Sequence, residues 1–253
     1  MKKKQYKALM LDLDGTTIPN ASDGFPSRRV TEAIKKAAKK IHVGVVTGRP
    51  FFYAEDIVQH LGLSGPSIAG GGTMILESST GEIIKESVIP DEDVQAMIAF
   101  LKKEKKTIWI NGKLTGKKSE IYNNTTKLHQ IRSFTIADLD PKRADKLDKL
   151  LNIFPSVSAH KIVGWIDGTI SLQVTPTEAT KQHGILEVAE LLQIQTHEII
   201  GVGDGYNDFP LLMACGLKVA MGNAVEDLKA IADYVAPTVE EDGVADVIEK
   251  FIL

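Results

Sequence analysis

Short apolar runs alternate with longer amphipathic stretches in the first part of the chain. One run covers 8–11 and leads directly into polar residues and a glycine, and others lie at 42–46 and 67–69. Short apolar runs bounded by turn residues are typical of buried strands. Apolar residues at helical spacing between these runs predict helices over about 28–40 and about 51–61.

The same alternation returns after residue 176. The expected elements, in order, are a helix at 181–192, a strand at 197–202, a helix at 209–214, a strand at 217–221, a helix at 225–231, a strand at 234–235 and a helix at 243–251. Strands that alternate with helices in this way predict an α/β fold with a mainly parallel, Rossmann-like sheet. Ser27 is well placed to cap the first helix.

The segment between these two parts has a different pattern. Its expected elements are a helix at 90–105, a strand at 107–111, strand-like runs near 120–122 and 131–136, a helix from Pro141 to about 152, and a hairpin formed by 158–163 and 169–174. Hairpins combined with two helices indicate an α+β domain. We therefore expect a core domain formed by 1–84 and 176–253, with an inserted domain at 85–175.

Composition and charge narrow the class of protein. The chain has 253 residues, of which 43% are hydrophobic and 25% are charged, and its net charge is −3. The insert carries 15 basic and 11 acidic residues (+4), and the remainder carries 15 basic and 22 acidic residues (−7). This balance does not favour nucleic acid as the main partner, and no run approaches the ~18 apolar residues of a membrane span. A single cysteine, Cys215, and scattered histidines give neither disulfides nor a zinc pattern, so we expect a cytoplasmic protein.

The first candidate chemistry follows the run at 8–11. Asp12 and Asp14 are separated by one residue, so on an extended chain their carboxylates point the same way. Two converging carboxylates are costly to ionise unless a cation lies near them or one keeps its proton. Taken alone, the pattern also fits a turn in which the aspartates accept backbone hydrogen bonds.

A second acidic pair follows the predicted strand at 197–202. Asp204 and Asp208 lie in the sequence GDGYND at 203–208. Ligands of open α/β sheets bind outside the carboxyl ends of the strands, where we expect all four aspartates to meet. A cluster of oxygen ligands favours Mg²⁺ over zinc. By itself the motif also fits an ordinary loop or a calcium turn.

Two further elements could hold a phosphoryl group. Thr47 and Gly48 end the run at 42–46 and offer a hydroxyl and backbone N–H groups. Lys181, at the start of a predicted helix, could neutralise charge on a phosphoryl group and on a carboxylate. Thr47 alone could equally be a helix cap, and Lys181 alone a solvated surface lysine. The placement of all four elements at strand ends or helix starts of one α/β framework favours the functional interpretation.

The motifs occur in a recognisable order: DLDGT at 12–16, VTGR at 46–49, Lys181, GDGYND at 203–208 and AMGNA at 220–224. In this order the whole chain resembles a haloacid dehalogenase superfamily phosphatase of the Cof-type branch, in which a C2B-type α+β cap lies between the second and third motifs.

The resemblance implies a role for each motif. Asp12 would be the nucleophile that forms an aspartyl-phosphate, and Asp14 the general acid and then the general base. Thr47 and Lys181 would position and neutralise the phosphoryl group, and Asn207 would orient Lys181 or contact the phosphoryl group. Mg²⁺ would be held by four groups: Asp12, the backbone carbonyl of Asp14, Asp204 and Asp208.

The chain departs from the family pattern at two loops. Gly70-Gly71-Gly72 stands where the family often has Asn-Gly-Ala, and residues 178–182 keep Lys181 but not its usual glycine neighbours. We expect these changes to alter loop shape or substrate entry. The resemblance assigns substrate specificity to the cap, whose candidate contacts are Lys117, Lys118, Lys127, Arg132, Trp109 and Trp165, although solvated lysines and packed tryptophans are the simpler interpretation.

These observations lead to one main expectation about function. The protein should be a Mg²⁺-dependent hydrolase of a small phosphomonoester such as a sugar phosphate, a monomer or homodimer without nucleic-acid or membrane partners. Three alternatives remain: a sugar phosphomutase, a phosphorylated receiver-like module, and a sensor that binds a phosphometabolite without turnover. The length of the insert argues against a receiver, and the presence of both Asp12 and Asp14 argues against a sensor.

Overall fold

The computed structural model describes residues 5–19, 24–101, 108–111, 113–114, 130–164 and 166–253. Contacts divide the chain into two compact units, 1–85 with 181–253, and 86–180. None of the helices in these described ranges is both long and apolar enough to cross a membrane. Each unit has its own apolar core.

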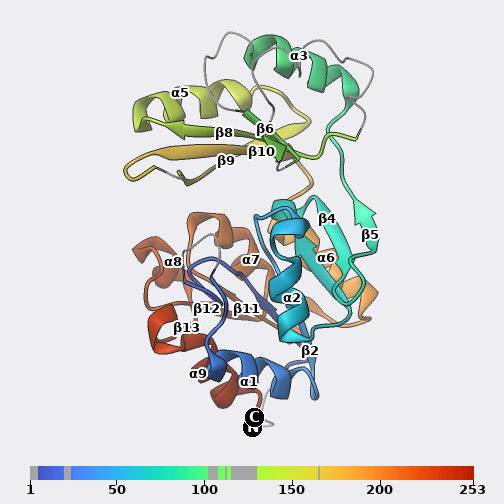
Figure 1. Ribbon diagram of the computed structural model, residues 1–253, viewed down its shortest axis with the longest axis vertical. Coiled ribbons are helices and arrows are strands. Elements are labelled where there is room, and N and C mark those ends of the chain that lie inside the picture. Colours follow the sequence, from blue (N-terminus) through green and yellow to red (C-terminus); the bar gives the residue numbers. More distant parts are fainter. Residues whose placement is uncertain (1–4, 20–23, 102–107, 112, 115–129, 165) are drawn as a thin grey trace. The chain divides into compact units, whose positions relative to one another are not determined.

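The first unit is built on a five-stranded sheet whose strand pairs are all parallel (Figure 1). In the order β13-β12-β11-β1-β2, its strands are Tyr234–Val235, Leu217–Ala220, Ile199–Gly203, Ala8–Leu11 and His42–Val45. The central strands β1 and β11 are buried throughout, because helices cover both faces of the sheet. This confirms the predicted α/β class.

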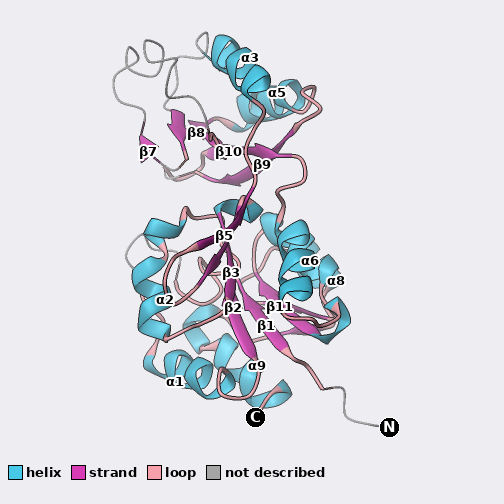
Figure 2. Cartoon of the chain, turned by 90° about the vertical axis from the view of Figure 1, so that its right-hand side faces the viewer, coloured by secondary structure: helices cyan, strands magenta, loops and turns pink. Residues whose placement is uncertain are grey.

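Helices flank this sheet on both sides. They are α1 (Arg28–Ala37), α2 (Glu55–Leu61), α6 (Lys181–Leu191), α7 (Phe209–Ala214), α8 (Glu226–Ile231) and α9 (Gly243–Phe251). α1 packs against α9, and α6 packs against α7. Figure 2 shows α1 and α6 on opposite faces of the sheet. Ser27 caps α1 as predicted, since its hydroxyl oxygen accepts a hydrogen bond from Val30 N at 3.1 Å.

The predicted helix over 51–61 is instead two elements. Residues Phe51–Tyr53 form a 3₁₀ turn, η1, and α2 begins only at Glu55. Pro50 starts the first element, and the carbonyls of Pro50 and Phe51 accept short-range bonds from Tyr53 N and Ala54 N. These bonds close 3₁₀ rather than α-helical turns, so the two pieces do not merge.

The run at 67–69 does not extend the parallel sheet as expected. It lies in β3 (Pro66–Ala69), which belongs to a separate three-stranded sheet with β4 (Met74–Glu77) and β5 (Ile83–Glu86). One parallel bridge, between Val46 and Ile68, joins β3 to the chain beyond β2. β3 pairs antiparallel with β4 through the turn η2 (Gly70–Gly72), whose three glycines all have positive φ, which is why glycine suits this turn.

An ion pair marks the place where the first unit is interrupted. Lys85, its last residue before the insert, lies 2.5 Å (Nζ to Oε1) from Glu187 in α6. α6 is the first element after the insert. The segments of this unit that leave for the insert and return from it are therefore in contact.

In the residues of the second unit that the structure describes, an antiparallel sheet is combined with two helices. In the order β7-β6-β8-β10-β9, its strands are Lys113–Leu114, Ile108–Ile110, Phe134–Leu139, Ile170–Pro176 and Val157–Val163, and its helices are α3 (Asp91–Leu101) and α5 (Pro141–Leu151). One apolar cluster contains residues of both helices and of the sheet, including the buried Phe134. The predicted α+β architecture and the β9–β10 hairpin are confirmed.

One predicted strand of this unit is displaced. β8 begins at Phe134, three residues later than the run at 131–136 suggested. The N–H groups of Arg132 and Ser133 donate to the side-chain oxygen of Asn111 and not to the backbone of a neighbouring strand. The carbonyl of Ser133 accepts from Asn111 N at 3.0 Å, just before the ladder of β8 begins. The expected strand near 120–122 lies outside the described residues, as do Lys117, Lys118, Lys127 and Trp165.

Candidate active site

The order of the strands brings the predicted motifs together. The chain runs from β1 outward to β2, and from β11 outward in the opposite direction to β12 and β13. The strand order thus reverses between β1 and β11, the position where open α/β sheets bind ligands. Leu11 lies in register with Val202, so Asp12 and the loop carrying Asp204 emerge side by side. Val46 N donates to Leu11 O, which brings Thr47 to the same edge.

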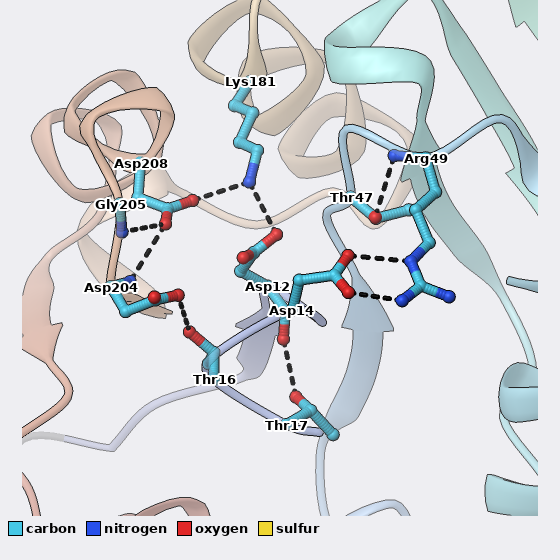
Figure 3. A network of polar contacts seen from close by, with 10 residues as sticks. All are labelled: Asp12, Asp14, Thr16, Thr17, Thr47, Arg49, Lys181, Asp204, Gly205 and Asp208. Atoms are coloured by element: carbon cyan, nitrogen blue, oxygen red, sulfur yellow. Dashed lines mark hydrogen bonds and ion pairs between the residues drawn. The ribbon is translucent and has the colours of Figure 1, made fainter. Parts of the chain in front are cut away.

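Three of the predicted carboxylates form one acidic cluster. A carboxylate oxygen from each of Asp12, Asp204 and Asp208 lies within 4.8 Å of the other two. Figure 3 shows these three side chains together with their hydrogen-bond partners. Asp12 follows β1, Asp204 follows β11, and Asp208 ends the 3₁₀ turn η5 (Tyr206–Asp208). Asp12 and Asp208 are buried, and Asp204 is partly exposed.

Lys181, the first residue of α6, is inserted into this cluster. Its ammonium donates to Asp12 Oδ1 at 2.7 Å and to Asp208 Oδ1 at 2.6 Å. The side chain is only 3% exposed, so the interpretation as a solvated surface lysine is excluded. A buried ammonium needs charged partners of this kind to offset its desolvation.

Asp208 also holds the loop that carries Asp204. Its second oxygen, Oδ2, accepts hydrogen bonds from Asp204 N and Gly205 N, both at 2.9 Å. Together with the bond from Lys181, three of its roughly four acceptor positions are used. A side chain at Gly203 would place its Cβ 2.4 Å from Asp208 Cγ, which explains why the motif begins with glycine.

The electrostatics of the cluster are those of crowded, buried charges. Burial and the neighbouring Asp208 raise the pKa of Asp12 well above its ordinary value, against the opposing effect of Lys181. Burial and Asp208 likewise raise the pKa of Asp204 to about 6. Burial alone would lower the pKa of Lys181, but the carboxylates of Asp12 and Asp208 raise it above the ordinary value, so the ammonium remains charged.

This donor set fits a hard divalent cation. Three carboxylates and one ammonium carry a formal charge of −2 when all are ionised. Oxygen donors without thiolate or imidazole are the ligands that Mg²⁺ and similar cations prefer. A divalent cation would cancel the excess charge that raises the pKa values of Asp12 and Asp204.

Two threonines that the sequence analysis did not single out connect the loops. Thr16 donates its hydroxyl hydrogen to Asp204 Oδ1 at 2.8 Å, and Thr17 donates to the backbone oxygen of Asp12 at 2.6 Å. Both follow Gly15, which makes the turn after Asp14 possible with a φ of 73°. Their position inside the DLDGTT motif was the available signal.

Asp14 does not join the acidic cluster through its carboxylate. Arg49 binds both of its oxygens, with Nε donating to Oδ2 at 2.8 Å and Nη2 to Oδ1, in a bidentate ion pair (Figure 3). The prediction that Asp14 contributes its backbone carbonyl to a metal site does not conflict with this arrangement. Arg49 belongs to the VTGR motif, but nothing in the sequence indicates that it pairs with Asp14.

Thr47 and Gly48 lie beside this ion pair. The buried Thr47 accepts a hydrogen bond on its hydroxyl oxygen from Arg49 N at 3.0 Å, and its backbone bonds to Ile68 O and Gly71 N anchor it to β3 and η2. Gly48 is half-buried in the same turn. Asn207 is half-buried in η5, next to Asp208. The roles expected of these three residues toward a phosphoryl group remain predictions.

A family model described as haloacid dehalogenase-like hydrolase matches residues 9–248 of the chain. A 5-amino-6-(5-phospho-D-ribitylamino)uracil phosphatase, YcsE, from Bacillus subtilis is 25% identical over 256 residues, covering 98% of this chain and 96% of the relative. A phosphoglycolate phosphatase from Methanopyrus kandleri is also 25% identical, covering 96% of each chain.

Solved structures have the same fold. The phosphatase BT1666 from Bacteroides thetaiotaomicron superposes with a TM-score of 0.82 at 22% identity, covering 99% of this chain and 96% of the other. The subclass IIB sugar phosphatase BT4131 superposes with a TM-score of 0.77 at 25% identity, covering 97% and 98%. The resemblance found in the sequence is thereby confirmed for the whole length of the chain.

Proposed function

The chain belongs to the haloacid dehalogenase-like hydrolase family, and we propose that it is a Mg²⁺-dependent phosphatase that hydrolyses a small phosphomonoester through an aspartyl-phosphate. The single observation that carries this proposal is the buried contact between Asp12 and Lys181. A carboxylate oxygen held at 2.7 Å by an ammonium, inside an acidic cluster, is fixed for attack on an anionic phosphorus centre.

In the proposed first step, a carboxylate oxygen of Asp12 attacks phosphorus and the bond to the leaving oxygen breaks. Asp14, protonated and released from its ion pair with Arg49, gives its proton to that oxygen, so the alcohol leaves neutral and Asp12 carries the phosphoryl group. In the second step, Asp14 takes a proton from water, whose oxygen attacks the same phosphorus atom. Inorganic phosphate leaves and the Asp12 carboxylate is restored.

Other residues of the chain would position the phosphoryl group. Lys181 would neutralise charge on it while keeping Asp12 in place, and Thr47, Gly48 and Asn207 would offer hydrogen-bond donors to its oxygens. Mg²⁺, when bound, would supply further charge neutralisation. Its ligands would be the carboxylates of Asp12 and Asp204 and the carbonyl of Asp14, with Asp208 holding the Asp204 loop and offering its remaining acceptor position.

The proposed substrate class is a small phosphorylated metabolite, such as a sugar or polyol phosphate. The similar proteins support this class, since they are named as phosphatases of a ribityl phosphate, of phosphoglycolate and of sugar phosphates. We propose that the unit formed by 86–180 is the cap that selects among such substrates, and that its net positive charge favours anionic ones.

The test is phosphate release from p-nitrophenyl phosphate and then from a panel of phosphorylated metabolites. We expect turnover with Mg²⁺, loss of turnover with EDTA, and loss of turnover in Asp12→Asn. Asp56→Asn, which changes an exposed aspartate in the first turn of α2, is the matched control and should keep full activity.

The outcomes separate this function from its alternatives. Dependence on a bisphosphate activator with little phosphate release would identify a phosphomutase instead. Binding of a phosphometabolite by the folded protein without turnover of any compound in the panel would identify a sensor. Full activity of Asp12→Asn would refute the aspartyl-phosphate mechanism.

A further inference from the structure

The loop after β12 contacts both of the loops that carry the acidic cluster. This loop, residues 221–225, contains most of the AMGNA motif. Met221 N donates to Gly203 O and Val225 N donates to Asp204 O, both at 3.0 Å. The Asn223 side chain reaches the other loop, where its Nδ2 donates to Gly15 O at 2.8 Å. One short segment thus holds the backbone on both sides of the cluster.

Asn223 is itself held at both ends of its amide. While Nδ2 donates to Gly15, Oδ1 accepts a hydrogen bond from Val239 N at 2.9 Å. Gly15 lies between Asp14 and Thr16, and Thr16 donates to Asp204. The Asn223 amide therefore fixes the turn at Gly15, and from this turn Thr16 contacts the loop that carries Asp204.

The glycine before Asn223 explains how the loop is anchored. A Cβ at Gly222 would lie 2.8 Å from Thr238 N and 3.0 Å from Ala236 O. Gly222 N also donates to Pro237 O at 3.2 Å. The loop is thus packed directly on the backbone of 236–238, which gives Asn223 a rigid base from which to hold Gly15.

The negative charge of the acidic cluster explains why the hydrogen bond from Asn223 to Gly15 matters. Asp12, Asp204 and Asp208 repel one another, and Lys181 offsets only one of the three negative charges. Repulsion between Asp12 and Asp204 pushes the loops after β1 and β11 apart. A neutral amide can hold these loops together without adding charge. An aspartate at 223 could not donate to Gly15 and would add a fourth negative charge.

We propose that Asn223 is a positioning residue that keeps the loop of Asp12 and Asp14 aligned with the loop of Asp204, so that their oxygens hold the spacing a divalent cation requires. This rests on the metal site of the proposed function. Asn223 contacts neither substrate nor cation, and it acts through Gly15 and Thr16. Groups that orient metal ligands in this indirect way typically change metal affinity by tenfold or more.

The test compares Asn223→Ala with Asn152→Ala. Asn152, at the end of α5 in the other unit, makes the same pair of contacts, since its Nδ2 donates to Asp148 O and its Oδ1 accepts from Ala159 N, both at 2.9 Å. Its Nδ2 also donates to Asp148 Oδ1 at 3.1 Å. Both alanine variants therefore lose side-chain amide hydrogen bonds to backbone groups, but only Asn223 belongs to the unit that contains the acidic cluster. Asn223→Gln, which keeps the amide on a longer side chain, serves if the alanine variant folds poorly.

The readout is Mg²⁺ binding by the full-length protein, measured from the rise in melting temperature with added Mg²⁺ and, separately, from the Mg²⁺ dependence of phosphatase activity. We expect the half-saturating Mg²⁺ concentration to rise about tenfold in Asn223→Ala and less in Asn223→Gln, with little change in Asn152→Ala. At saturating Mg²⁺, KM for substrate should stay near the wild-type value.

Each outcome decides the proposal. Equal Mg²⁺ affinity in wild type and Asn223→Ala, with both alanine variants losing similar thermal stability, would show that Asn223 is merely structural and overturn its role. A wild-type protein whose melting temperature does not respond to Mg²⁺ would overturn the metal site, and this inference with it. Metal binding in a wild type without phosphatase activity would refute the proposed function alone, since the melting-temperature comparison would still test Asn223.

Discussion

The inner and outer halves of the site hold their charges differently. The inner half consists of Lys181, Asp12 and Asp208, whose side chains are at most 7% exposed. The outer half is the ion pair of Asp14 and Arg49, whose side chains are 36% and 16% exposed. Both halves contain hydrogen-bonded opposite charges. Only in the outer half is a carboxylate, that of Asp14, exposed enough to exchange its hydrogen bonds with Arg49 for hydrogen bonds with water.

This difference matches the two tasks that the proposed hydrolysis assigns to aspartates. A nucleophile must stay in line with phosphorus, and a buried carboxylate held by a buried ammonium cannot easily turn away. A general acid and base must meet first a leaving group and then water, which requires access. Asp12 and Asp14 are the same type of residue, so the proposed difference in their roles depends on their burial and on their partners.

The largest expected effect comes from Lys181→Met. It leaves Asp12 and Asp208 buried without their cation, and breaking a buried pair costs about 3–5 kcal/mol of unfolding free energy. Activity should fall by about 10²- to 10³-fold because charge neutralisation at the reacting centre is lost. Urea unfolding and steady-state kinetics measure the two effects.

Lys161→Met is the matched control for that change. Lys161 pairs with Asp145 at 2.6 Å, but both side chains are exposed. Exposed pairs contribute little to stability. If both lysine variants unfolded at the same urea concentration, the distinction between buried and exposed pairs would lose its energetic basis.

A smaller effect is expected from Arg49→Ala in the outer half. Asp14 would lose its bidentate partner and its fixed orientation, and a displaced catalytic group can cost about tenfold to a hundredfold in kcat. KM and the urea midpoint should change little. Arg49→Lys should recover only part of the rate, since an ammonium cannot reproduce the guanidinium fork. An unchanged kcat in Arg49→Ala would mean that Asp14 needs no partner to be positioned.

The smallest effect is a pH dependence that arises from Asp204, the partly exposed member of the acidic cluster beside the inner half. The pKa of Asp204 is raised from 3.8 to about 6, so its contribution to the stability of the metal-free protein is present below about pH 4 and is lost as the pH rises through 6. Mg²⁺ competes with that proton. Melting temperatures with Mg²⁺ and with EDTA should therefore differ more at about pH 7.5 than at about pH 5.5. A larger difference at the lower pH would contradict the assignment of Asp204 to the cation site.

The parallel sheet of the core could be predicted from the sequence because each of its strands is marked by a local pattern. The runs that became β1, β2 and β11 are short, apolar and followed by polar turns, and their parallel pairing places Asp12, Thr47 and Asp204 at one edge without further information. The burial of Lys181 could be inferred only from the order of the motifs, since a helix start with a lysine is common at surfaces.

Side-chain partners were harder to predict because they depend on tertiary register. Nothing local links Arg49 to Asp14 or Asn223 to Gly15, which are separated by 35 and 208 positions. The displaced start of β8 was also unpredictable from local sequence. It depends on hydrogen bonds from Arg132 N and Ser133 N to the side chain of Asn111, which precedes them by 21 and 22 residues. Gly70-Gly71-Gly72 was noted as a departure, but its positive φ angles became evident only in the η2 turn.

The contact between Lys85 and Glu187 bears on how the core accommodates its insert. Residues on both sides of the insert are in contact within the core, so the insert is a long excursion whose two ends lie near each other. The entropic cost of closing such a loop rises only slowly with its length, so the core places little constraint on the size of the insert. If the unit formed by 86–180 selects the substrate as we propose, evolution could change it while the acidic loops of the core stay the same.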